Sequence, residues 1–286
     1  MFRPRSAHRS ADKGGKDSRM GSTDQPTIDL VVDIGNSRVK LALFQGPRVL
    51  RFARIDRLDA DALQSFLGAD RPTHIAAASV GVPVGPLLHV LSAHGPVVEL
   101  TGASPAPLPN TYSTPSTLGV DRLANAAALH ALFPGRPALA IDLGTCITYD
   151  LVLPGTGFVG GAISPGPRMR GQAMHRYSAR LPLVEDPGRP ALVGTDTLGG
   201  LASGIHHGVR FELAGMIGEL GQQHTGLAVV LTGGAAPAFA AALKSGIFAD
   251  PLLTLRGLHV LLAHHRLHPC DPGSGGAAAD VGAGKR

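Results

Sequence analysis

Two acidic glycine loops constrain this chain more than any other feature. The first runs from Asp33 to Lys40 as Asp-Ile-Gly-Asn-Ser-Arg-Val-Lys, and the second runs from Asp142 to Asp150 as Asp-Leu-Gly-Thr-Cys-Ile-Thr-Tyr-Asp. Each loop lies between two apolar runs, which predicts a strand, a tight Asp-x-Gly turn and a second strand. Because the loops are far apart in sequence, we expect two similar half-domains that face a shared cleft.

The tips of such hairpins are suited to phosphate chemistry. A tight glycine turn directs several backbone N–H groups toward one point, where a phosphate can bind. The first loop adds Asp33 for a cation or its waters and Lys40 for phosphate charge. An ordinary hairpin is the alternative, since Gly-Asn is a common turn pair. The second loop makes the functional interpretation the stronger one.

The second loop adds a hydroxyl and further acidic groups. Thr145 is a candidate donor to a phosphate oxygen, and Asp142 is a candidate cation ligand. Asp150 is equally well explained as a helix cap or a salt-bridge partner. Cys146 is expected to be a small buried residue, because no histidine stands beside it to activate the thiol.

Composition limits the class of protein. The 286 residues suffice for one large domain or two ordinary ones, and 44% of them are hydrophobic. The two cysteines, Cys146 and Cys270, are too few for a disulfide framework, which favours a reducing, cytoplasmic setting. No apolar run reaches the length of a membrane span.

The net charge of +5 comes mostly from the N-terminal segment. Residues 1–26 hold six Lys or Arg against three Asp, which leaves 20 basic and 18 acidic residues in the rest of the chain. That near balance argues against a nucleic-acid-binding face. We expect 1–26 and 269–286 to be disordered, the first as a basic extension without the apolar core of a signal peptide. Between them we expect half-domains at 27–118 and 119–268.

Periodicity predicts the elements of each half. The expected strands are a hairpin over 27–44, then 49–55, 74–80 and 97–100, a second hairpin over 138–153, and 228–231. The expected helices are 59–67, 86–93, 119–132, 199–220 and 255–265. Strands followed by helices, twice over, describe the duplicated α/β architecture shared by actin, sugar kinases and acetate kinase. Glycines along 199–220 make that helix a candidate packing or dimer face.

Three further segments are candidates for the site. Asp121 and Arg122 stand at a predicted helix start, where they form either a cap with a salt bridge or a catalytic pair. As a pair, Asp121 would take a proton from a substrate hydroxyl and Arg122 would hold an anionic group. The stretch 160–166 is expected to be a rigid turn that lines a small-molecule pocket. Gly233 and Gly234 follow a strand and permit close approach of a flat ligand such as adenine.

Other patterns are weaker. Residues 155–160 match GxGxxG, but they follow a hairpin strand and do not open a helix, so a dinucleotide site is not indicated. The sequence contains no GxxxxGK[ST] and therefore no P-loop. Histidines at 264, 265 and 268 are expected at a solvated helix end, not around zinc.

The ordered set of segments resembles type III pantothenate kinase over about 28–262. The segments are Asp33-x-Gly-Asn-Ser-x-x-Lys40, Tyr112-x-x-Pro-x-x-Leu-Gly-x-Asp-Arg122, Asp142-x-Gly-Thr-x-x-Thr-x-Asp150, Gly160-Gly-x-Ile-x-Pro-Gly166, and Asp196-Thr197 followed by Ser203-Gly204-Ile205. The resemblance implies an actin-like duplicated fold in a homodimer. It also implies transfer of the ATP γ-phosphoryl group to the primary hydroxyl of pantothenate, the first step of coenzyme A synthesis.

The resemblance also implies roles for individual residues. The implied ATP contacts are Asp33, Ile34, Gly35, Asn36, Ser37, Arg38, Val39, Lys40 and Thr145. The implied pantothenate contacts are Tyr112, Gly119, Val120, Asp121, Arg122 and Thr197, with Thr197 contributed by the same subunit or by its partner. Asp121 becomes the general base. Asp142 binds a monovalent cation, K⁺ or NH₄⁺, and Mg²⁺ accompanies the nucleotide. Ser37 and Cys146 stand where the family more often has Thr and Ala.

Two alternatives belong to other functional classes. Some relatives were first described as accessory factors of transcription, and in that case 1–26 would bind nucleic acid. The near-neutral remainder of the chain disfavours this hypothesis. Another kinase of the same fold, acting on a sugar or acetate, or a polyphosphate phosphatase, is the other alternative. The stretch from Tyr112 to Arg122 disfavours it.

Overall fold

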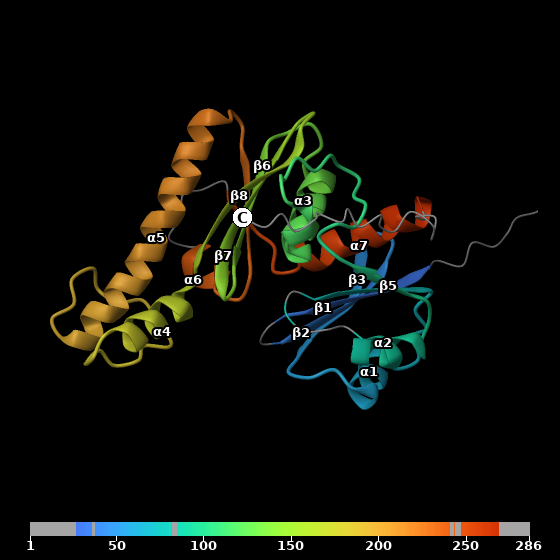
Figure 1. Cartoon of the computed structure of the whole chain (residues 1–286), viewed down its shortest axis with the longest axis horizontal. Helices are drawn as coiled ribbons and strands as arrows, with labels where there is room; N and C mark the ends of the chain where they lie inside the picture. Colours follow the sequence, from blue (N-terminus) through green and yellow to red (C-terminus); the bar gives the residue numbers. More distant parts are fainter. Residues whose placement is uncertain are drawn as a thin grey trace, which may run out of the picture.

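The computed structural model describes residues 27–35, 38–79, 81, 85–240, 243 and 247–268. Both predicted disordered ends, 1–26 and 269–286, lie outside these residues, as do Asn36 and Ser37 at the tip of the first hairpin. Within them the chain forms two five-stranded sheets with helices on their faces (Figure 1).

The first sheet has the first hairpin at its centre. In spatial order its strands are β3 (Arg48–Ile55), β2 (Val39–Gln45), β1 (Ile28–Ile34), β4 (His74–Ser79) and β5 (Val97–Leu100). Strand β1 is antiparallel to β2 and parallel to β4. A short hairpin connection therefore joins β1 to β2, whereas β4, on the other side of β1, is reached only after β3 and α1.

The second sheet repeats this order. Its strands are β8 (Gly157–Pro165), β7 (Cys146–Leu153), β6 (Ala138–Leu143), β9 (Ala228–Thr232) and β10 (Ile247–Ala249). Strand β6 is antiparallel to β7 and parallel to β9, as β1 is to β2 and β4. The predicted duplicated, actin-like α/β fold is therefore confirmed. The boundary placed between 118 and 119 stays a prediction.

Helices cover the sheets and join them. On the first sheet lie α1 (Ala60–Leu67) and α2 (Gly85–Ser92), and with the second sheet lie α4 (Pro167–Tyr177), α5 (Thr197–Gln223) and α6 (Ala236–Ala240). A short 3₁₀ turn, η1 (Pro115–Thr117), precedes α3 (Val120–Leu132). Helix α3 packs against α7 (Leu253–Leu267), and Figure 1 shows this pair between the two sheets. The pair connects the two halves.

Strand alternation explains why the first sheet is buried on both faces. On β2, Leu41 and Leu43 join the core under α1 and α2, whereas Ala42 and Phe44 join the core around α3 and α7. At Gly257 of α7, any side chain would collide with the backbone of Ala124 on α3. A glycine and a run of alanines are thus the residues that let α3 and α7 pack closely.

Most predicted elements are present, but the expectation for 160–166 is wrong, and Cys146, expected to be buried, is only partly buried and lines a cavity. The stretch 160–166 is not a rigid turn, because residues 157–165 form β8, which pairs antiparallel with β7. The reason for its glycines is close backbone contact, since a side chain at Gly161 would collide with the carbonyl of Tyr149. Helices α4 and α6 and strand β10 had no corresponding prediction. None of the helices in the described ranges has the length and apolar character to cross a bilayer.

Candidate active site

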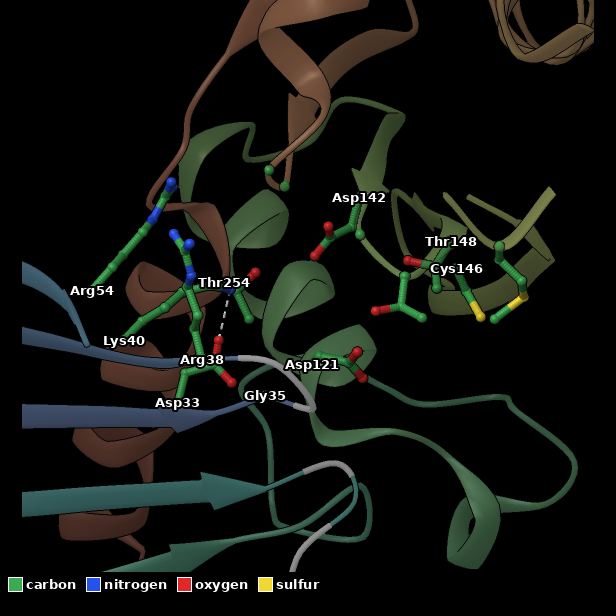
Figure 2. Close-up of a pocket in the computed structure, with 15 residues that line it drawn as sticks. Asp33, Gly35, Arg38, Lys40, Arg54, Asp121, Asp142, Cys146, Thr148 and Thr254 are labelled. Carbon is green, nitrogen blue, oxygen red and sulfur yellow. Dashed lines mark hydrogen bonds and ion pairs between the residues drawn. The ribbon is translucent and has the colours of Figure 1, made fainter. Parts of the chain in front are cut away.

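A cavity of about 560 Å³ lies between the two acidic glycine loops (Figure 2). Both halves of the duplicated fold contribute to it. The lining residues are Asp33, Gly35, Arg38, Lys40, Arg54, Asp121, Asp142, Gly144, Thr145, Cys146, Thr148, Met169, Gly233, Gly234 and Thr254. Loops far apart in the sequence therefore meet at one site.

The first hairpin contributes a closed ion pair. Asp33 on β1 stands directly opposite Lys40 on β2, and the Lys40 ammonium donates to the Asp33 carboxylate at 2.9 Å. Burial lowers the pKa of Lys40, but the charge of Asp33 and its hydrogen bond outweigh burial, so the pKa of Lys40 is raised. At the turn, the Gly35 N–H donates to the Arg38 carbonyl at 3.0 Å. Lys40 is thus held as a cation at the edge of the cavity.

The second hairpin contributes a carboxylate without a cationic partner. Asp142 on β6 stands opposite Thr148 on β7, and the Gly144 N–H donates to the Cys146 carbonyl at 3.0 Å. Burial is the largest influence on Asp142 and raises its pKa to about 6, opposed by Lys40 and reinforced by the charges of Asp121 and Asp33. No ion pair forms at Asp142 within the described part of the chain. Such a carboxylate is suited to a bound cation.

Asp121 faces the cavity from the first turn of α3. Its Oδ1 accepts a hydrogen bond from the Arg122 N–H at 2.9 Å. Burial raises the pKa of Asp121, and the charge of Asp33 adds to this effect, while the Arg122 N–H opposes it. A carboxylate with a raised pKa is a better proton acceptor than an ordinary aspartate. The position and basicity of Asp121 therefore suit a general base.

Arg122 lies beneath the cavity in a buried polar network. Its Nε donates to Asp150 at 2.6 Å, so the salt-bridge interpretation of Asp150 is confirmed. Asn125 on α3 and Thr148 also donate to Asp150, at 3.3 and 3.2 Å. Thr254 on α7 in turn donates to Asn125 at 3.0 Å. This network fixes α3, β7 and α7 relative to one another.

The charge of Arg122 is secured by its neighbours. Burial lowers the pKa of Arg122, but the charge of Asp150 and its hydrogen bond outweigh burial, so the pKa of Arg122 is raised. The guanidinium carbon lies 5.5 Å from the centre of the Tyr112 ring and 5.7 Å from that of Phe158. Arg122 and Tyr112 thus lie together at the start of α3, next to the cavity but outside its lining.

The structure separates the residues expected at the site into three groups. Those that line the cavity are Asp33, Gly35, Arg38, Lys40, Thr145, Asp121 and Asp142. Those outside its lining are Ile34 and Val39, which belong to the core under α1 and α2, together with Tyr112, Gly119, Val120, Arg122 and Thr197. Asn36 and Ser37 lie outside the described residues. Thr197 begins α5, on the second half of the molecule.

Sequence reasoning missed several cavity residues. Arg54 on β3, Met169 on α4 and Thr254 on α7 come from elements that reach the site only through tertiary packing. A signal existed for Arg54, because it is the last polar residue of the strand predicted over 49–55. Gly233 and Gly234 line the cavity, and a side chain at Gly233 would collide with Asp142 and Leu143. Close approach of the backbone thus requires glycine at 233.

The donor set fits hard cations. Asp33, Asp121, Asp142, Thr145 and Thr148 offer carboxylate and hydroxyl oxygens, the ligands that Mg²⁺ and monovalent cations prefer. In the described ranges, no group of three or more His, Cys, Asp or Glu side chains forms a metal cage. The residues present therefore fit a cation whose coordination is completed by phosphate or water.

Comparisons with known proteins agree with this geometry. A family model described as type III pantothenate kinase matches residues 29–219. The type III pantothenate kinase of Bacteroides fragilis is 37% identical over 239 residues, which cover 83% of this chain and 98% of that protein. The type III pantothenate kinase of Christiangramia forsetii is 36% identical over 243 residues, covering 84% and 99%.

Among solved structures, a protein described as a Baf family transcriptional activator from Campylobacter jejuni aligns with a TM-score of 0.56. It is 20% identical, and the alignment covers 83% of this chain and 99% of that one. At this identity the likeness concerns the fold alone. The match to the family model and the identity to curated relatives over nearly their whole length carry the assignment: the chain belongs to the type III pantothenate kinase family.

Proposed function

We propose that this protein transfers the γ-phosphoryl group of ATP to the primary hydroxyl of pantothenate, the first step of coenzyme A synthesis. The observation that carries the proposal is the position of Asp121, a partly buried carboxylate that lines the same cavity as both acidic glycine loops. Membership of the family gives the identity of the acceptor.

The nucleotide is proposed to bind between the two turns. Backbone N–H groups near Gly35 and Thr145 meet the phosphates, and Lys40 supplies positive charge. The backbone at Gly233 and Gly234 forms a flat surface for adenine. Phosphoryl transfer depends mainly on aligning the acceptor oxygen with the γ-phosphorus and on neutralising charge. A rigid cavity wall favours that alignment.

Asp121 acts on the acceptor. As the pantothenate oxygen forms its bond to the γ-phosphorus, the hydroxyl proton passes to the Asp121 carboxylate and ADP leaves. The raised pKa of Asp121 makes this proton transfer more favourable. The polar network around Arg122 holds the first turn of α3, and with it Asp121, in place.

Cations complete the charge balance. Asp142 would hold a monovalent cation, K⁺ or NH₄⁺, and Mg²⁺ would accompany the ATP phosphates. When bound, these ions neutralise part of the charge on the nucleotide tail. Ionised Asp142 is required for the monovalent site, so the affinity for that ion should fall as the pH drops through about 6.

The second half of the molecule supports a homodimer. Large apolar side chains are exposed along α4, α5 and the segment that joins them: Tyr177, Leu183, Leu192, Val193, Leu198 and Phe211. A dimer formed over this face would bury them and would bring Thr197, at the start of α5, to the interface. Light scattering of the wild type and of Leu198→Glu tests this, with loss of the dimer as the expected result. The cytoplasmic location and the absence of nucleic-acid binding stay predictions.

The decisive experiment is an assay of the purified full chain with pantothenate and Mg-ATP. The reaction is run with K⁺, NH₄⁺ or Na⁺ as the only monovalent cation, and with glucose and acetate as alternative acceptors. We expect 4′-phosphopantothenate only in the pantothenate reactions, with the highest rate in K⁺ or NH₄⁺. Folded protein that binds ATP but does not phosphorylate pantothenate would contradict the proposal.

A further inference from the structure

The charges that line the cavity are balanced before any nucleotide enters. Three carboxylates, Asp33, Asp121 and Asp142, face three cations, Arg38, Lys40 and Arg54. An ATP tail adds several negative charges to this set. Binding therefore favours a cation that is not already neutralised by a protein carboxylate.

Two of the three cations already have acidic partners. Lys40 lies 2.9 Å from Asp33, and Arg38 lies 3.6 Å from Asp56 in an exposed pair. Across the ranges that the structure describes, Arg54 forms no ion pair, and its guanidinium carbon lies 5.5 Å from the centre of the Phe52 ring. Figure 2 shows the Arg38 and Arg54 side chains extending in the same direction from the first sheet.

The sheet register makes the position of Arg54 unusual. Arg54 on β3 stands directly opposite Lys40 on β2, on the face that carries Ala42 and Phe44. Like charges directly opposite one another destabilise a sheet. The charge of Arg54 also acts to lower the pKa of Lys40. An anion that lies against both side chains would turn this repulsion into a binding contribution.

We propose that Arg54 binds the polyphosphate tail of the nucleotide. The guanidinium presents several N–H donors in a planar fork, which matches two phosphate oxygens better than an ammonium does. Lys40 would contact the tail while it remains paired with Asp33, and Arg54 would supply the charge that this pair does not. The proposal rests on the proposed function only in taking ATP as the nucleotide.

The test is a calorimetric titration of ATP, ADP, AMP and adenosine into the wild type, Arg54→Ala and Arg54→Lys. Loss of a charge-assisted hydrogen-bonded contact predicts roughly 10- to 100-fold weaker binding of ATP and ADP to Arg54→Ala. AMP and adenosine should bind as they do to the wild type. Arg54→Lys should recover part of the loss, since it keeps the charge without the fork.

Arg48→Ala is the matched control. Arg48 is an exposed arginine on the same strand that does not line the cavity, so its removal changes the net charge equally. Its nucleotide affinities should equal those of the wild type. Thermal unfolding of each variant checks the fold, and Arg54→Lys serves as the test variant if Arg54→Ala unfolds.

The outcomes separate this inference from the proposed function. Unchanged ATP affinity in Arg54→Ala would overturn the proposed contact, as would an equal loss of affinity for adenosine. Neither result would contradict pantothenate phosphorylation by the wild type. Wild-type protein that binds ATP without phosphorylating pantothenate would overturn the function, and a selective loss of ATP and ADP binding in Arg54→Ala would still support the contact.

Discussion

The two acidic glycine hairpins occupy equivalent places in the duplicated fold but differ in the residue that stands opposite the aspartate. In the first, Asp33 stands opposite Lys40, and in the second, Asp142 stands opposite Thr148. Both turns are closed by a backbone hydrogen bond of 3.0 Å, from Gly35 or Gly144 to a carbonyl farther along the loop. The loop between the paired strands is one residue shorter in the second hairpin, and the side chain opposite the aspartate sets the charge of each hairpin.

The two hairpins therefore present different charges to the cavity. The first hairpin holds a neutral ion pair, whereas the second holds a partly buried carboxylate whose pKa is raised to about 6. Since the cavity lies between them, the nucleotide would meet a protein cation on one side and a bound cation on the other. The residue opposite each aspartate, Lys40 or Thr148, is thus one difference that makes the second hairpin a candidate cation site.

The second hairpin is also braced from outside. The Gly166 N–H donates to the Thr145 carbonyl at 3.0 Å, which fixes the loop against the start of α4. Glu212 on α5 accepts from the Tyr149 hydroxyl at 2.7 Å and also binds Ser164 and Arg170. This support keeps β7, β8 and α4 together behind the loop.

Asp121→Asn should have the largest effect, because it removes the proposed general base, which lies outside both hairpins. The variant should lose roughly 10²- to 10⁴-fold in kcat while ATP binding is retained. The measurement is steady-state turnover of pantothenate, together with a calorimetric ATP titration. An Asp121→Asn enzyme that turns over at the wild-type rate would remove Asp121 as the base.

Lys40→Met breaks the ion pair of the first hairpin. It leaves the Asp33 side chain, only 7% exposed, without its cation, and breaking such a pair costs about 3 kcal/mol of unfolding free energy. Urea denaturation at pH 8 measures the loss. The double variant Asp33→Asn with Lys40→Met should regain much of the stability, since no uncompensated charge remains. A Lys40→Met protein as stable as the wild type contradicts the pairing.

Asp142→Asn tests the open carboxylate of the second hairpin. The folded-state pKa of about 6 exceeds the ordinary value of 3.8, so Asp142 favours folding when protonated and disfavours it when ionised. Without K⁺ or NH₄⁺, the variant should be more stable than the wild type at pH 8 by at most about 3 kcal/mol, and most of the difference should be lost by about pH 4.

Denaturation between pH 4 and 8 measures this difference, and added K⁺ should reduce it. Asp56→Asn is the control, because the Asp56 side chain is 93% exposed and its removal should leave the pH dependence unchanged. A pH-independent difference between Asp142→Asn and the wild type would show that Asp142 is not the titrating group.

Thr148→Lys makes the second hairpin resemble the first. A cation opposite Asp142 should lower the pKa of that carboxyl by about 1–3 units and replace the bound monovalent ion. The expected result is a small change in rate with loss of the K⁺ or NH₄⁺ response. Thr148→Met, similar in size but uncharged, should keep that response. A Thr148→Lys enzyme that still needs K⁺ or NH₄⁺ would show that the residue opposite Asp142 does not control cation binding.

Local pattern was enough to predict much of the fold. The two hairpins, the helix at α1 and the long helix α5 were predictable because apolar periodicity and turn residues act over a few positions. The strand β8 was not, because its glycines resemble a turn, and their real cause is contact with the backbone at Tyr149. A glycine in the sequence indicates that a side chain would not fit at that position, but it does not identify the neighbouring residue that occupies the space.

The sequence by itself determined the duplicated hairpins, their acidic residues and Asp121 at the start of α3. Only the tertiary structure decided that Arg122 pairs with Asp150 and that Arg54 reaches the cavity. It also decided that Lys40 is bound to Asp33, while Asp142 has no ion-pair partner among the described residues. The physical reason is that charge depends on distance and burial. Cross-strand register and the packing of α3 on α7 set both, and neither can be read from spacing along the chain.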